Sequence, residues 1–140
     1  YAGDTEIEFF EAEQVEVLAP ATGVEPPPLP LSTHNASQEA NEGWLVQVTG
    51  TVVDWIDSSA IVVDDGSGPV RAFLDGYNGS FAGVGRLDRV TVTGLVSEDG
   101  EGRRIRVRNY GAHPALPDDV TILARAERVY LPVVVREAAP

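Results

Sequence analysis

Short runs in which apolar and polar residues alternate fill the middle of the chain, from Gly43 to Asn109. These runs are rich in β-branched residues and are separated by Gly, Asp and Ser, which is typical of antiparallel strands joined by tight turns. The runs cover residues 44–54, 60–63, 70–74, 88–96 and 103–108. We therefore predict an all-β domain with five short strands.

The residues between the runs predict the connections. Residues 64–68, which contain Asp65-Gly66, and residues 98–102 have the composition of hairpin turns. A glycine inside the first run, Gly50, permits a bend between two sheets. Four glycines disfavour a stable helix in residues 76–86, so we expect a loop or a single turn there, with Phe81 and Val84 closing the bottom of the barrel.

The alternation also predicts which side chains face the core. In the first strand we expect Leu45, Val48 (or Val46) and Val52 to point inward. In the fourth we expect Val90, Val92 and either Leu95 or Val96, beyond a bulge at Gly94. In the fifth, Ile105 and Val107 point inward, and three arginines face outward: Arg104, Arg106 and Arg108.

This succession of strands resembles the OB-fold, in particular the small OB-like modules of exported bacterial proteins, such as the tandem modules of secreted nucleases and surface proteins. The resemblance implies a five-stranded Greek-key barrel over residues 43–110, with extended N- and C-terminal arms. It also implies an extracellular or cell-surface location on a bacterium.

The N-terminal arm, residues 1–18, alternates in the same way but has no hairpin partner. Ile7 and Phe9 alternate with Glu6 and Glu8, which predicts extended pieces, although a helix over residues 9–17 is an alternative. The pattern resembles the closing strand of a preceding module. Such a strand is unstable alone, so it either folds back on its own barrel or adds to the sheet edge of another chain.

Two further segments flank the predicted barrel. Residues 19–42 form a proline-rich linker, with a short helical turn capped by Ser32 or Asn35 before the first strand. Residues 111–140 form the C-terminal arm, with a short strand at 120–123 and an extended run at 127–136 that Pro132 confines to a sheet edge. Four apolar residues of this run must be buried against this barrel or a neighbouring subunit: Tyr130, Leu131, Val133 and Val135.

Charge is distributed unevenly along the chain. The 22 acidic residues outnumber the 10 arginines, there is no lysine, and the net charge is −12. Residues 1–66 hold 13 of the acids and no basic residue, whereas residues 67–140 hold all 10 arginines and 9 acids. This asymmetry can steer the head of one copy toward the tail of another, unless both halves are simply solvated. The excess of acid makes nucleic acid an unlikely partner.

The sequence contains no arrangement of residues that predicts catalysis. His34 and His113 have no nucleophile motif near them, and the absence of cysteine excludes thiolate chemistry. We predict no cofactor, except that Asp57, Asp64 and Asp65 are oxygen ligands of the kind that bind Ca²⁺. Asp65-Gly66 is equally a turn dipeptide.

We predict that the protein is not an enzyme but a structural module that self-associates head to tail by strand addition, giving a homo-oligomer or a homopolymer such as a filament or surface layer, with no membrane span. Arg104, Arg106 and Arg108 would face Glu6 and Glu8 of a neighbour, while Ile7, Phe9 and the C-terminal run would supply apolar burial. The alternative is a module of a larger secreted enzyme that binds carbohydrate or single-stranded nucleic acid, with Arg71 and aromatic side chains on its face.

Overall fold

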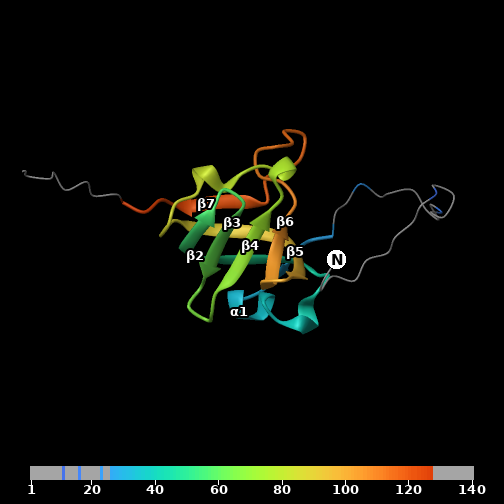
Figure 1. Ribbon diagram of the computed structural model, residues 1–140, viewed down its shortest axis with the longest axis horizontal. Coiled ribbons are helices and arrows are strands. Elements are labelled where there is room, and N and C mark those ends of the chain that lie inside the picture. The colour runs from blue at the N-terminus through green and yellow to red at the C-terminus, as the bar shows by residue number, and fades with distance from the viewer. Residues whose placement is uncertain (1–10, 12–15, 17–22, 24–25, 128–140) are drawn as a thin grey trace, which may run out of the picture.

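Residues 11, 16, 23 and 26–127 are the part of the chain that the computed structural model describes. Seven strands form the main part of this structure and curl around one core (Figure 1). In chain order the elements are β1 (Leu29–Pro30), α1 (Thr33–Ala36), η2 (Glu39–Asn41), β2 (Leu45–Asp57), β3 (Ala60–Asp64), β4 (Val70–Leu74), η3 (Gly76–Asn78), η4 (Phe81–Gly83), β5 (Arg89–Asp99), β6 (Gly102–Val107) and β7 (Val120–Ala124).

Five of these strands close into a barrel. The neighbours run β2-β3-β4-β6-β5, and β5 returns to pair with β2. All of these pairs are antiparallel except β4 with β6, which are parallel. This connectivity is that of an OB-like Greek-key barrel, and it confirms the predicted fold class. The strand ends differ from the predicted ones by at most three residues.

β2 and β5 are long because each belongs to two sheets. The first half of β2 pairs with β5 from Leu45↔Leu95 to Thr51↔Arg89, and its second half pairs with β3. Gly50 of β2 and Gly94 of β5 lie where neighbouring strands approach closely. A Cβ on Gly50 would lie 2.7 Å from the carbonyl oxygen of Asp64, and one on Gly94 would lie 2.4 Å from that of Arg106. Both glycines therefore allow neighbouring strands to approach where the barrel curves.

The core consists mostly of β-branched side chains from the barrel strands. Val46, Val48 and Val52 are the buried residues of β2, so the prediction for Leu45 is wrong. In β5, Val96 is buried and Leu95 is 39% exposed, which decides between those two alternatives. The remaining inward predictions are confirmed, including the plug: Val90, Val92, Ile105, Val107, Phe81 and Val84.

β1 and β7 extend one half of the barrel into a wider sheet. In that half the strand order is β1-β2-β5-β7, with β1 parallel to β2 and β7 antiparallel to β5. The predicted linker thus includes residues that belong to the barrel wall, because Leu31 packs against the core and Ala36 is fully buried. Ser32 caps α1, as expected, by accepting a hydrogen bond from the N–H of Asn35 at 3.2 Å. Among the described residues no helix is long and apolar enough to cross a membrane.

Candidate interaction surfaces

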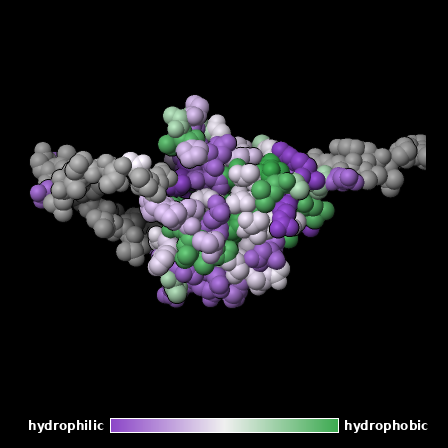
Figure 2. Space-filling model, turned by 180° about the vertical axis from the view of Figure 1, so that it is seen from behind, coloured by the Kyte–Doolittle hydropathy of each residue, from purple (hydrophilic) through white to green (hydrophobic). Residues whose placement is uncertain are grey.

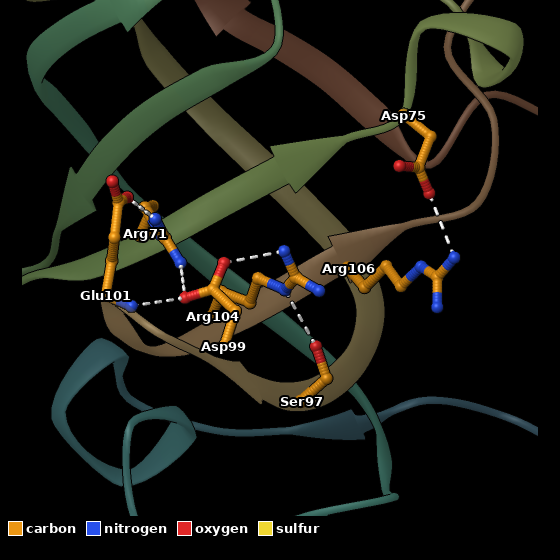
Figure 3. A network of polar contacts seen from close by, with 7 residues as sticks. All are labelled: Arg71, Asp75, Ser97, Asp99, Glu101, Arg104 and Arg106. Carbon is orange, nitrogen blue, oxygen red and sulfur yellow. Dashed lines mark hydrogen bonds and ion pairs between the residues drawn. The ribbon is translucent and has the colours of Figure 1, made fainter. Parts of the chain in front are cut away.

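The outward arginines of β4 and β6 form one strip on the barrel, as predicted for the fifth strand. Arg71 lies opposite Arg104 in the parallel pair, and Arg106 follows two residues later on β6. Figure 3 shows that acidic side chains of the same chain meet all three. Arg104 binds Asp99 at 2.7 Å and Ser97 at 3.1 Å, Arg106 binds Asp75 at 3.0 Å, and Arg71 binds both Asp99 and Glu101.

Asp99 is the centre of this network. Its partial burial favours the neutral acid, but hydrogen bonds from Arg71 and from the N–H of Glu101, with the charge of Arg104, outweigh that effect and hold the pKa of Asp99 below its usual value. The Arg104 guanidinium also lies 4.5 Å from the centre of the Phe73 ring, in a cation–π contact. The strip is thus largely neutralised within its own chain.

Arg108, the third arginine of the predicted interface, does not join the strip but binds Asp119. Its Nε and Nη2 donate to the two carboxylate oxygens of Asp119 at 3.0 and 2.8 Å, and its backbone N–H donates to the same side chain at 3.0 Å. This fork ties the end of β6 to the residue before β7. The predicted partners of these arginines, Glu6, Ile7, Glu8, Phe9, Tyr130, Leu131, Val133 and Val135, lie outside the described residues, so that assignment stays a prediction.

The three aspartates proposed for Ca²⁺ do not form one cluster. Asp57 ends β2 and accepts hydrogen bonds from the N–H and hydroxyl of Ser59, both at 2.7 Å, which lower its pKa. Asp64 is the last residue of β3, at its opposite end, and Asp65 follows it. Within residues 26–127, no group of three or more His, Asp or Glu side chains is arranged to hold a metal ion. The structure therefore separates Asp57 from Asp64 and Asp65 along β3, and calcium binding stays a prediction.

Asp65 instead fastens α1 to the β3–β4 turn. It accepts hydrogen bonds from the hydroxyl and the N–H of Thr33, at 2.8 and 3.2 Å, and from the N–H of Ser67 at 2.9 Å. The hydroxyl of Ser67, its N–H and the hydroxyl of Thr33 together lower the pKa of Asp65 far below its usual range. Because Thr33 is fully buried, this carboxylate satisfies polar groups that water does not reach.

Replacing this carboxylate should weaken the fold in a pH-dependent way. Asp65→Ala should lower the free energy of unfolding at pH 7 by about 1 kcal/mol, a value kept small because Asp65 itself is exposed to solvent. A depressed folded-state pKa stabilises above the unfolded value of about 4 and loses that contribution as pH falls below it. Urea titrations at pH 7 and pH 3 should show the difference shrinking at pH 3; an equal difference at both would contradict the charge argument.

An apolar groove lies where β1, β2 and β5 meet. It has a volume of about 1000 Å³ and is lined mainly by prolines and large apolar side chains: Pro26, Pro27, Pro28, Leu29, Pro30, Trp44, Leu45 and Leu95, with Gly43 and Arg108. The side chain of Trp44 is 54% exposed, although Val46, two residues later in the chain, is fully buried. On the face seen in Figure 2, hydrophobic side chains likewise gather in separate patches between hydrophilic ones.

The chain leaves β7 at the opposite edge of this sheet, where the buried Asp88 holds it. Asp88 accepts hydrogen bonds from the N–H of Ala126 at 2.9 Å, the N–H of Gly85 at 2.8 Å and the guanidinium of Arg125 at 3.2 Å. Two more arginines flank this carboxylate, Arg86 and Arg89, and both are exposed. No feature of the sequence pattern distinguished Asp88 from a surface aspartate.

Comparisons with known proteins bear on the fold through one solved structure. No family model matches the chain, and no curated protein matches it. Among solved structures, the chain is similar to an OBody, AM1L10, bound to hen egg-white lysozyme, with 24% identity and a TM-score of 0.51 over 74% of this chain and 100% of that one. It also matches the hypothetical protein ygiW from E. coli, with 23% identity and a TM-score of 0.43 over 60% of this chain and 87% of that one. At 24% identity the likeness to the OBody supports the barrel fold and nothing finer.

Proposed function

We propose that this protein is an extracellular structural module that self-associates head to tail through its terminal segments. The observation that carries the proposal is the strand order β1-β2-β5-β7, in which the two terminal segments join opposite edges of one sheet. Residues 26–28 lead into β1, and residues 125–127 follow β7 on the other side of the barrel (Figure 1). A contact between unlike edges of two copies is heterologous and can repeat without closing, which builds a polymer.

Strand addition is the mode of contact that the sequence of the N-terminal segment favours. Residues 6–9 alternate between polar and apolar side chains, and an extended segment of this kind can continue the ladder of an existing sheet. Backbone hydrogen bonds would set the geometry. Burial of Ile7, Phe9 and the apolar residues of the C-terminal run would supply most of the free energy, at roughly 25 cal/mol per Å².

Removal of residues 1–18 should abolish assembly and leave the barrel folded. The described core lies between Ala36 and Val120, so the truncation removes no side chain of the core. Light scattering coupled to size exclusion should show the full chain as large species and the truncated chain as a monomer, with unchanged circular dichroism. A matched truncation of residues 137–140, beyond the apolar run, should assemble like the full chain. Polymers that survive the loss of residues 1–18 would refute the proposal.

One observation favours a second function, that of a ligand-binding module. Tyr77 is 68% exposed and lies beside Arg106, on the β4–β6 face where Arg104 covers Phe73. OB barrels bind oligosaccharides and single strands on the face of their second and third strands, here β3 and β4, which adjoins this surface. The paired acids Asp75 and Asp99 make a neutral oligosaccharide a better fit than a polyanion. A full chain that is monomeric and binds an oligosaccharide would favour this function over assembly.

A further inference from the structure

We infer that the acceptor for the N-terminal strand is the outer edge of β7 in a second copy, together with the arginines beside it. This inference rests on the proposed head-to-tail assembly and names the surface that receives the strand. Within the described residues, β1 and β7 are the two terminal strands of the sheet, and each pairs on one side only. The choice between them follows from their sequences.

β1 is a poor acceptor for another strand. It has two residues, Leu29 and Pro30, and Pro28 precedes it. Proline has no backbone N–H, so neither Pro28 nor Pro30 can donate to an added strand. Proline is a common device that protects a sheet edge from pairing. The β1 edge is therefore closed to strand addition, although its side chains line the apolar groove.

β7 has the opposite character. Its five residues, Val120–Ala124, include no proline and no charged side chain, and all five keep a backbone N–H. Leu123 is 51% exposed and Thr121 is also exposed, whereas Val120 and Ile122 face the core. Natural sheets protect exposed edges with charge, proline or bulges. β7 has neither charge nor proline, and the register shift at Leu123 interrupts its ladder with β5 at only one position. Its outer edge is therefore suited to receive a strand.

The charge around β7 complements the N-terminal segment. Residues 1–18 contain six acids and no basic residue. Arg89 of β5 lies between Ala124 of β7 and Thr51 of β2, and it lines a polar pocket with Asp64 and Asp65. Arg86 lies in the turn that Asp88 holds, and Arg125 follows β7 directly. Within the described residues Arg86 and Arg89 have no ion pair, in contrast to the arginines of β6. The geometry therefore favours Arg86 and Arg89 as partners of Glu6 and Glu8.

A second copy is a better source of the strand than the same chain. Residues 10–28 separate Phe9 from β1, and β1 and β7 are three strand spacings apart, roughly 14 Å. The length would permit a return to the same barrel. However, Pro26, Pro27 and Pro28 stiffen the segment as it leaves β1, and such a spacer resists folding back across the sheet. The two edges also lie on opposite sides, which is the arrangement that a repeating contact needs.

Reversing the charge at β7 in the full chain tests this inference. The double variant Arg86→Glu with Arg89→Glu should weaken assembly about tenfold, because two exposed ion pairs are lost and replaced by repulsion. The neutral pair Arg86→Gln with Arg89→Gln should weaken it less. Adding Glu6→Arg and Glu8→Arg to the first variant should restore assembly. Arg106→Glu reverses one charge on β6, half the change of the double variant, and tests the alternative acceptor. It should leave assembly unchanged if β7 receives the strand.

The outcomes separate this inference from the proposed function. Sedimentation velocity across a concentration series measures assembly, and thermal unfolding followed by circular dichroism verifies that each variant is folded. If the truncation of residues 1–18 abolishes assembly but the β7 variants do not weaken it, the acceptor is wrong and the proposed function stands. If Arg106→Glu weakens assembly and the β7 variants do not, the β6 strip is the acceptor. A monomeric full chain overturns both.

Discussion

Gly94→Ala should lower the free energy of unfolding by about 3 kcal/mol. An ideal Cβ at this position would lie 2.4 Å from the carbonyl oxygen of Arg106, 2.9 Å from its carbonyl carbon and 2.8 Å from Cγ2 of Ile105. Two of these three atoms are backbone, so a change of rotamer cannot relieve the contact. β5 would have to move away from β6 at the point where it passes from one sheet to the other. The cost therefore comes from lost strand pairing as well as from overpacking.

Gly100→Ala is the matched control for this substitution. Gly100 lies between β5 and β6, has no heavy atom within 4 Å of an added Cβ, and has no positive φ that would strain an alanine. Its replacement should change stability by less than about 0.5 kcal/mol. Urea denaturation of the two variants measures the difference directly. Equal stability of the two would mean that the barrel tolerates a wider separation of β5 and β6 than the distances allow.

The strands were predictable because the signal for them is local. Alternation with a period of two and turn residues such as Asp65-Gly66 depend only on neighbours in sequence. The residues of the first strand that face the core are harder to predict, because Leu45 is as apolar as the residues that are buried. It points outward because Val46, Val48 and Val52 fill the core. Leu45 then lies opposite Leu95 in the β2–β5 ladder, and the two line the groove together.

The candidate site was predictable only in part, because charges find partners that are distant in sequence. The alternation placed Arg104 and Arg106 on the outer face, and that is where they lie. The composition of residues 98–102 predicts a turn, but Asp99 is the last residue of β5 and only Glu101 lies in the turn. Both reach Arg71, about thirty residues earlier in the chain. Asp57, Asp64 and Asp65 are close in sequence but not in space. A strand of five residues spans roughly 17 Å, which separates Asp57 from Asp64.

Two buried polar residues organise the region around β7, and the sequence pattern identified neither. Asp88 holds the chain after β7 at one end, and Asn109 holds the loop before β7 at the other. Both lie in polar stretches that are typical of surface turns, so composition gives no sign of their burial. The contacts that they make involve residues 113–126, which precede and follow β7. If β7 is the acceptor edge, these two residues determine where that edge stands.

Asn109→Asp should strongly destabilise the protein, and the size of the effect should depend on pH. The Asn109 side chain is buried, and its amide nitrogen donates to the carbonyl oxygens of Leu116 and Pro117 at 3.2 Å and to the Asp118 carboxylate at 3.3 Å. Its Oδ1 accepts from the N–H of His113 at 2.9 Å. A carboxylate here would turn an oxygen toward those acceptors and add a buried charge next to Asp118. We expect a loss of about 3 kcal/mol at pH 7.

The sign of the pH dependence follows from the same contacts. Burial and the surrounding oxygens favour the protonated acid, so the pKa of the new carboxyl in the folded state should exceed its unfolded value of about 4. Protonated, the group keeps an O–H that can donate as the amide does. The deficit relative to the unmodified chain should therefore be small below pH 4 and grow as pH rises through the folded-state pKa. Urea denaturation at pH 4 and pH 7 measures it, with the exposed Asn35→Asp as control. A deficit that is equal at both values would show that the loop depends on the shape of the amide rather than on its N–H donors.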